Sequence, residues 1–413
     1  MAAVETPTVH DLCVEAKRAS RALAQLDTSS KDAALLAIAD ALEARVGEIL
    51  EANALDLEAG REAGLSPALM DRLKLDGSRV GAMAAGVRAI AALPDPVGEV
   101  IDGQRLPNGL DVRKVRVPLG VIGVVYEARP NVTIDAAALC LKSGNAIILR
   151  GSSSAQHSNA VLAAIAAGAA PEGAIQLLGG GREALAELAT QEGLVDLVIP
   201  RGGEGLKAAL RDVATVPVIY AASGNCHVYV DASADLGRAV DIVLNAKTQR
   251  PGVCNAAETL LVHAGVAGAF LPAVGEALRG AGVELRGDER ARAAFEMAPA
   301  SAEDWDTEFL ALVLAVGVVD SVEAAIEHVN RHGSGHSEAI LTRDTAAARA
   351  FQRGVDAACV YVNASTRFTD GGEFGMGAEI GNSTQKLHAR GPIGLRELCT
   401  FKYLVEGDGH VRA

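Results

Sequence analysis

The sequence has 413 residues and a formal net charge of −14. This length exceeds what one hydrophobic core usually serves, so we expect two or more domains. The acidic charge, without any cluster of Lys and Arg, argues against nucleic-acid binding. The first residues lack a signal peptide's cationic and apolar regions, and no apolar run approaches the ~20 residues of a membrane span. We therefore expect a cytoplasmic protein that does not bind membranes.

Residues 4–93 are predicted to form a layer of helices. The segment 26–53 places apolar side chains at helical spacing. Ser29, followed three residues later by Asp32, predicts a helix start that resembles a capping box.

A β-hairpin is predicted over residues 106–120. Asn108-Gly109 lies between two alternating segments, and Asn-Gly is the strongest short-range hairpin signal. The alternation is polar on one side, so this hairpin should protrude and be able to pair with the edge of another chain.

From residue 121 onward, short apolar runs alternate with helical segments. This pattern is typical of βαβ units around a parallel sheet that is covered on both faces. It occurs in two blocks, which predicts two α/β lobes. The expected strands are "VIGVVYE", "NAIILRG", "AIQLLGG", "VDLVIPRGG" and "VPVIYAASG" in the first block, and "CHVYVD", "ETLLVHA", "LVLAVGVVD", "EAILTRD" and "ACVYVNA" in the second.

The six cysteines form no Cys-x-x-Cys pair, and no His pair has metal-ligand spacing, so we expect no metal site. Cys254 differs from the others because it follows a Pro-Gly break in "KTQRPGVCNAAETLLV" and has Arg250 just before it. A catalytic thiol needs exposure and nearby positive charge, since the thiolate is the nucleophile. Composition alone favours a buried structural thiol, as most unpaired cysteines are.

Several segments resemble the aldehyde dehydrogenase superfamily. "EARPNVT" (127–133) is similar to its Pro-x-Asn turn, and "SGNAIILRGSSS" (143–154) to the strand that follows. Together with "QRPGVCNAAETLLV" and "HGSGHSEAILT", they resemble one branch in particular, the γ-glutamyl phosphate reductases or glutamate-5-semialdehyde dehydrogenases. The resemblance extends over essentially the whole chain and implies two Rossmann-like three-layer α/β lobes with a small β oligomerisation arm.

The resemblance also implies a division into three parts. Residues 1–105 and 121–228 would form a dinucleotide-binding domain, and residues 229–365 a catalytic domain. The hairpin 106–120 and the tail 366–413 would form the arm, so we expect at least a homodimer.

Residue roles follow from the same resemblance. Cys254 would be the nucleophile, and Asn131 would donate a hydrogen bond to the oxygen that becomes negative. A serine pair beside an arginine replaces the usual acidic ribose partner, which favours NADPH over NADH. The expected cofactor residues are Arg150, Gly151, Ser152, Ser153, Arg201, Gly202, Gly203 and Glu308. The expected substrate residues are Arg129, Arg250, Asn363, Ser365, Thr366 and Arg367.

One absence bears on the reaction. Hydrolytic members of the superfamily have a glutamate that activates water in the segment aligned with "IYAASGNCHV", whereas this chain has Tyr220, Ala221 and Ala222 there. Without that base a thioester on Cys254 should persist until hydride or phosphate arrives.

The expected function is therefore the NADPH-dependent reduction of γ-glutamyl phosphate to glutamate 5-semialdehyde and phosphate, in proline biosynthesis. A separate glutamate 5-kinase would supply the labile acyl phosphate, so we also expect a transient contact with that kinase. Two alternatives are a hydrolytic semialdehyde dehydrogenase and an inactive superfamily member with a structural role.

Overall fold

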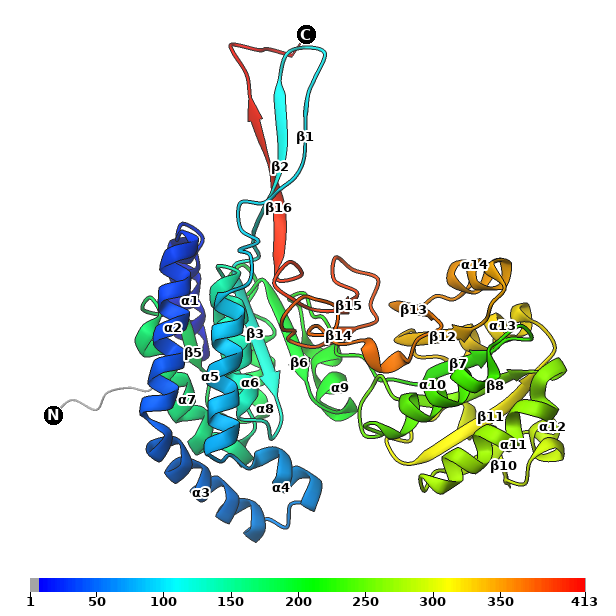
Figure 1. The fold of residues 1–413 in the computed structure, drawn as a ribbon. Coiled ribbons are helices and arrows are strands. Elements are labelled where there is room, and N and C mark those ends of the chain that lie inside the picture. Colours follow the sequence, from blue (N-terminus) through cyan, green and yellow to red (C-terminus); the bar gives the residue numbers. More distant parts are fainter. Residues whose placement is uncertain (1–6, 413) are drawn as a thin grey trace. The chain divides into compact units, whose positions relative to one another are not determined.

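A computed structural model describes residues 7–412 of the chain (Figure 1). These residues divide into two compact units, each built from more than one stretch of sequence. Unit 1 comprises Met1–Ala221, Gly375–Gly381 and Ile393–Ala413, and unit 2 comprises Ala222–Phe374 and Asn382–Pro392. Each unit contains a parallel sheet with helices packed on it, so the prediction of two α/β lobes is confirmed.

The described part of unit 1 begins with the predicted helical layer. Its helices are α1 (Val9–Leu23), α2 (Thr28–Ala44), α3 (Val46–Glu62), α4 (Pro67–Leu73) and α5 (Gly77–Ala91). The predicted start of α2 at Ser29 is wrong, because Asp27 is the N-cap and accepts from the backbone N–H of Ser30 at 2.8 Å. A carboxylate at this position satisfies an N–H that would otherwise be unpaired in the first turn.

The sheet of unit 1 is parallel, with strand order β5-β4-β3-β6. The chain runs from β3 to β4 and β5 on one side of β3 and then crosses to β6 on the other side. Ligands bind α/β sheets at such switch points. The predicted strand over 216–224 makes only a single bridge, between Val198 and Val218. The elements are β3 (Val121–Tyr126), α6 (Asn131–Lys142), β4 (Ala146–Gly151), η1 (Ser153–Ala155), α7 (Gln156–Ala169), β5 (Ile175–Leu177), α8 (Arg182–Leu188), β6 (Leu197–Arg201) and α9 (Glu204–Val213).

A separate antiparallel sheet projects from unit 1 (Figure 1). It has strand order β1-β2-β16, from β1 (Val100–Arg105), β2 (Asp111–Pro118) and β16 (Cys399–Glu406). The predicted Asn108-Gly109 turn connects β1 and β2, and Gly109 has the positive φ of 96° that such a turn requires. The hairpin begins earlier than predicted, and only Cys399–Glu406 of the tail 366–413 joins it as a strand. We call these three strands the arm.

Unit 2 contains a parallel sheet with order β10-β9-β11-β8-β7-β12-β13. Two of these strands were not predicted, because β9 has one apolar residue among four and β10 has two residues. The strands are β7 (Cys226–Val230), β8 (Ala257–His263), β9 (Glu284–Gly287), β10 (Ala298–Pro299), β11 (Val313–Val319), β12 (Ser337–Leu341) and β13 (Cys359–Val362).

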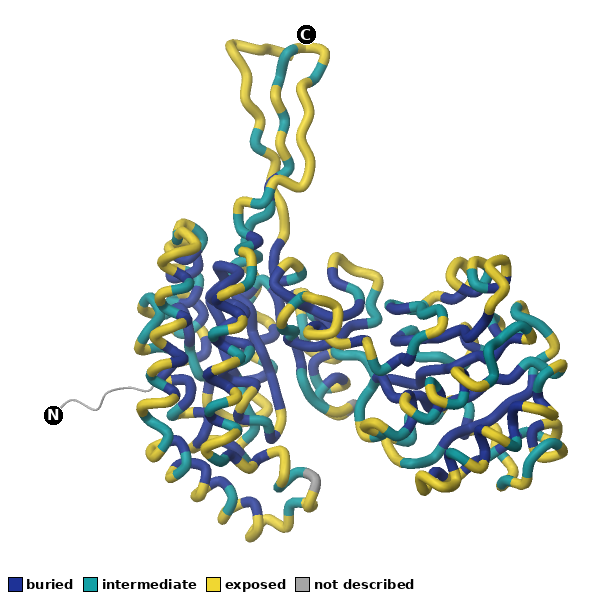
Figure 2. Tube along the Cα trace, in the orientation of Figure 1, coloured by how far each residue is buried: buried dark blue, intermediate teal, exposed yellow. Residues whose placement is uncertain are grey.

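Helices cover both faces of this sheet, and its central strands β7, β8, β11 and β12 are largely buried, whereas the edge strand β10 is exposed (Figure 2). Val228 of β7 packs in a cluster with α10 (Leu236–Thr248), α11 (Ala264–Gly280) and α12 (Glu289–Ala294). The next residue, Tyr229, packs with α13 (Val322–His332) and α14 (Thr345–Gly354) on the other face, as the alternation of side chains along a strand dictates. The remaining elements are η2 (Glu303–Asp306), η3 (Thr366–Phe368), β14 (Asn382–Ser383) and β15 (Gly391–Pro392).

The boundary between the units lies earlier than residue 229, where it was predicted. Gly224 and Asn225 already bind unit 2: the N–H of Gly224 donates to Glu308, and the side chain of Asn225 donates to the carbonyls of Trp305 and His332. These bonds, made before β7 begins, assign the segment to unit 2. Among residues 7–412, no helix has the length and apolar character needed to span a membrane.

Candidate active site

Cys254 is the partly exposed cysteine of the six, and the other five are buried. It lies in the turn between α10 and β8. Burial raises the pKa of Cys13 and Cys399 to about 12 and also raises the pKa values of Cys140 and Cys226. Because only the thiolate is nucleophilic, the structure favours Cys254 over these four as a reactive residue.

The backbone of the Cys254 turn is held by close contacts within unit 2. A Cβ atom on Gly224 would lie 1.5 Å from the carbonyl oxygen of Cys254, so only glycine fits there. The thiol of Cys226 donates to the same carbonyl at 3.2 Å. Asn255, the next residue, donates through its amide to the carbonyls of Arg367 and Thr369. The turn is therefore fixed on both sides of the thiol.

Two of the predicted substrate arginines lie near this turn. Arg367 donates from Nε to Gln249 at 2.8 Å. Burial and the neighbouring positive charge of Arg250 lower the pKa of Arg367, while the Cys254 thiol opposes that shift. Arg250, Arg367 and Cys254 are therefore close enough to interact. Paired guanidinium groups suit a phosphate or a carboxylate, and they also stabilise a nearby thiolate.

The structure shows what the polar residues predicted beside them contact. The Thr366 hydroxyl donates to the carbonyl of Asn255 at 2.7 Å, and Ser365 accepts from the N–H of Arg367. The bond from Thr366 holds η3 against the cysteine turn, whereas Ser365 caps the start of η3 itself. Asn363 instead binds the backbone of Thr342 with both ends of its amide, and its φ is 56°. Its side chain thus stabilises the loop after β13.

Glu308 lies in unit 2, between η2 and β11. One of its carboxylate oxygens accepts from the N–H of Gly224 at 2.7 Å. Since Gly224 touches the backbone of Cys254, Glu308 is two contacts away from the nucleophile candidate.

In unit 1 the predicted cofactor segments meet at the carboxyl ends of three adjacent strands. Ser152, after β4, accepts from the N–H of Ala128, which follows β3. Glu127, also after β3, accepts from the N–H of Gly203, which follows β6. The segments 127–131, 150–153 and 201–203 are therefore brought together at the switch point of the sheet.

The details of this group suit a bound dinucleotide. A Cβ on Gly202 would lie 2.7 Å from the carboxyl carbon of Glu127, so glycine lets this side chain pack closely against the loop. Helix α9 begins after Gly203 without a side-chain cap, and N–H groups at such a helix start bind phosphate. Arg150 donates to the carbonyl of Gly181 at 3.0 Å, while its Nε is buried without a hydrogen-bond partner. Gly151 and Ser153 complete the segment after β4.

Asn131 begins α6 and is exposed. Its Nδ2 donates to Asp135, one helical turn later, at 3.0 Å. Burial raises the pKa of Asp135 to about 6, although the bond from Asn131 and the positive charge of Arg201 both lower it. Arg129 lies in the same turn, before α6.

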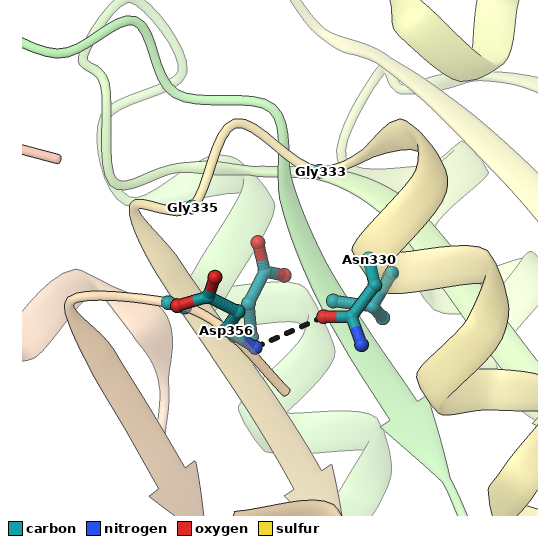
Figure 3. A pocket seen from close by; sticks show the side chains of 7 residues that line it. Asn330, Gly333, Gly335 and Asp356 are labelled. Atoms are coloured by element: carbon teal, nitrogen blue, oxygen red, sulfur yellow. Dashed lines mark hydrogen bonds between the residues drawn. The ribbon is translucent and has the colours of Figure 1, made fainter. Parts of the chain in front are cut away.

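A pocket of about 290 Å³ lies elsewhere in unit 2, between the end of α13 and the starts of β12 and β13 (Figure 3). Asn330 accepts there from the N–H of Asp356 at 2.9 Å, and Gly333 and Gly335 complete the rim. The pocket contains none of the predicted site residues. Glu338 lines it, and the adjacent Ser337 faces the other side of the sheet, where it binds Thr369. The pocket is therefore on the face of the sheet away from Thr369 and Asn255.

Sequence reasoning missed three features of the site. Gly224 lies within the segment inspected for a glutamate, but glycine alone gives no sign of a close backbone contact. Asp135 follows Asn131 at helical spacing, which was a usable signal for a hydrogen-bonded pair. Lys247 and Glu258 flank the cysteine in the sequence. Lys247 was expected to be a cationic neighbour of the thiol, but it forms a buried ion pair with Glu258. Among the described residues, no three His, Cys, Asp or Glu side chains are placed to hold a metal ion.

Comparison with known proteins shows which family the chain belongs to. The model of the aldehyde dehydrogenase family matches residues 1–300 and 293–402. The γ-glutamyl phosphate reductase of Syntrophomonas wolfei is 59% identical over 96% of this chain and 97% of its own length, and that of Moorella thermoacetica is 60% identical over 96% and 97%. The crystal structure of γ-glutamyl phosphate reductase from Thermotoga maritima matches with a TM-score of 0.97 at 48% identity, covering 98% of this chain and 100% of that one.

The chain belongs to the aldehyde dehydrogenase family and, within it, to the γ-glutamyl phosphate reductases. It is an oxidoreductase that acts on a small molecule, and the family implies a nicotinamide cofactor.

The raised pKa of Asp135 gives a testable pH dependence. Its pKa is about 6 in the folded protein and near 3.8 ordinarily, so between these values the folded protein retains a proton that the unfolded chain has lost. The extra bound proton stabilises the folded protein fully at a pH below 3.8, and this stabilisation is lost as the pH rises through about 6. The Asp135→Asn variant, which cannot titrate, should gain stability relative to the wild type between about pH 4 and pH 7. Thermal unfolding of both proteins across that range would show this, and parallel curves would contradict it.

Proposed function

We propose that this chain reduces γ-glutamyl phosphate to glutamate 5-semialdehyde and phosphate, with NADPH as cofactor and Cys254 as nucleophile. The observation that carries the proposal is the position of Cys254, partly exposed in a turn fixed by Gly224 and close to Arg250 and Arg367. This reaction is the step of proline biosynthesis that precedes ring closure. The cytoplasm remains the expected location.

The first step follows from the groups around the thiol. The thiolate of Cys254 attacks the acyl carbon, the bond to the phosphate oxygen breaks, and phosphate leaves with its electron pair. Arg250 and Arg367 would bind the phosphate or the α-carboxylate and keep the thiol ionised. Arg129 is a further candidate for these anions. We propose that the side chain of Asn131 donates to the acyl oxygen as it becomes negative, an interaction whose loss in other enzymes slows the reaction about 10²–10³-fold.

We propose that the residues of unit 1 bind NADPH. The start of α9 would bind the pyrophosphate. Ser152 and Ser153 put no negative charge beside Arg150, which would favour a ribose 2′-phosphate there. NADPH bound there supplies the hydride that reduces the thioester. Glu308 would hold the nicotinamide ribose. The thiohemiacetal then releases the aldehyde and returns the thiol to Cys254.

Water would be a poor competitor in this scheme, because the segment in which hydrolytic members of the superfamily carry the water-activating glutamate has none here. Tyr220, Ala221 and Ala222 carry no carboxylate. Two glutamates of unit 2 that contact segments around the Cys254 turn already have partners. Glu258 forms an ion pair with Lys247, and Glu308 accepts from the N–H of Gly224. This speaks against a hydrolytic dehydrogenase, and the fixed Cys254 turn speaks against an inactive structural protein.

Phosphate dependence tests the proposal. With glutamate 5-semialdehyde and NADP⁺, the purified protein should sustain NADP⁺ reduction only when inorganic phosphate is present, because phosphate must discharge the thioester. Cys254→Ser should abolish this activity, whereas Cys140→Ser, at a buried thiol in unit 1, should retain it. Sustained turnover without phosphate would refute the proposal, and so would an active Cys254→Ser variant.

We further propose that the arm joins two copies of this chain. Strand β16 is an edge of the sheet, and it exposes 47% of Phe401, 60% of Tyr403 and 56% of Val405. Alternate residues of a strand share a face, so these three form one apolar strip beside unpaired backbone groups. A second copy of the chain would cover the strip and pair with the edge. Transient contact with a glutamate 5-kinase stays a prediction.

Tyr403→Lys together with Val405→Lys should dissociate the oligomer, since two desolvated charges oppose the contact. Sedimentation velocity would detect the shift to monomers. Val411→Lys is the control, because Val411 is 91% exposed and lies beyond β16. An unchanged sedimentation coefficient for the double variant would rule out this strip as the interface.

A further inference from the structure

A fully buried ion pair spans the Cys254 turn. Lys247 lies in the last turn of α10, and Glu258 is the second residue of β8. Their Nζ and Oε2 atoms are 2.5 Å apart, and both side chains are 0% exposed. The chain between them is the turn that carries Cys254. The pair therefore joins the element that precedes this turn to the element that follows it.

The same glutamate holds a third segment. Its Oε1 accepts from the backbone N–H of Leu310 at 3.2 Å. Leu310 has a φ of 54°, a conformation that non-glycine residues adopt rarely. A Cβ atom placed on Gly252, which is inside the Cys254 turn, would lie 3.7 Å from the carbonyl oxygen of Leu310. The bond to Glu258 thus helps to keep an unfavourable backbone conformation in place beside the turn.

The third segment also reaches the carbonyl of Cys254 from another direction. Glu308, two residues before Leu310, accepts from the N–H of Gly224 at 2.7 Å. Gly224 packs directly against the backbone of Cys254. Lys247 and Glu258 are therefore connected to the turn both along the chain and through Leu310, Glu308 and Gly224.

Stability alone does not account for this pair. Burial raises the pKa of Glu258 to about 7 and lowers that of Lys247, which reflects the penalty of taking both charges out of water. Replacing a buried ion pair by well-packed apolar residues of similar size often leaves the stability of the folded protein unchanged or raises it. An apolar side chain in place of Glu258, however, could not accept from Leu310.

We propose that the Lys247–Glu258 pair is a positioning element for the thiol of Cys254, fixing the end of α10, the start of β8 and the Leu310 segment around it. The inference rests on the proposed function, in which Cys254 is the nucleophile. Neither residue touches the substrate in this account. Both act through the backbone that they hold.

The test compares Lys247→Met with a matched control, Lys31→Met. Lys31 is also buried in an ion pair, with Asp95, but in unit 1. Turnover of glutamate 5-semialdehyde with NADP⁺ and phosphate should show a kcat at least about tenfold lower for Lys247→Met, because small displacements of reacting groups slow catalysis strongly. The KM for the aldehyde should change less than about twofold, since the substrate-binding groups remain. Lys31→Met should lower the thermal midpoint and leave kcat unchanged.

A graded pair of substitutions at Glu258 keeps the test decisive if Lys247→Met does not fold. Glu258→Gln retains an oxygen that can accept from Leu310, whereas Glu258→Leu removes it. The expected order of kcat is wild type, then Glu258→Gln, then Glu258→Leu. Equal kcat for all three would overturn the proposal.

A second readout does not depend on turnover. Iodoacetamide should alkylate Cys254 in the resting protein more slowly in Lys247→Met than in Lys31→Met, as measured by mass spectrometry of the peptide containing Cys254. If Cys254→Ser remains active, the proposed function fails. If Cys254→Ser is inactive while folded Lys247→Met keeps wild-type kcat and alkylation, only the positioning role fails.

Discussion

The proposed chemistry of this chain depends on one backbone contact, the packing of Gly224 against the carbonyl of Cys254. There is no room for a side chain at residue 224, because a Cβ would lie 1.5 Å from that oxygen. The contact fixes the turn from which the thiol projects, and the thiol of Cys226 and the amide of Asn255 hold it from other sides. A nucleophile held in this way needs little reorganisation before it attacks.

In unit 1, the order of the strands brings the candidate cofactor residues together. Its glycines and small polar residues follow three parallel strands, and parallel strands carry their carboxyl ends to one edge of the sheet. The contacts of Ser152 with Ala128 and of Glu127 with Gly203 show how closely the loops approach. In the proposed cofactor site, N–H groups at the uncapped start of α9 would take the place of the dinucleotide fingerprint with three spaced glycines.

The fold could be predicted from the sequence wherever local patterns determine it. The alternating strands and helices, the Asn108-Gly109 turn and the helical layer all depend on periodicity or turn chemistry, and all are present. The domain boundaries and the extent of the arm were less accurate, because the contacts of Asn225 with Trp305 and His332 join residues far apart in the chain. Cys254 could be singled out by its Pro-Gly break and its cationic neighbours. The buried state of Lys247 and Glu258 could not be foreseen, since charged residues are usually exposed.

The central claim is that Cys254 forms a thioester that water does not discharge. The direct measurement is mass spectrometry of the protein after incubation with glutamate 5-semialdehyde and NADP⁺ in buffer without phosphate. The account predicts a glutamyl adduct on the peptide containing Cys254, formed together with a stoichiometric amount of NADPH and removed when inorganic phosphate is added. An adduct on another residue, or steady release of free glutamate without phosphate, would contradict it.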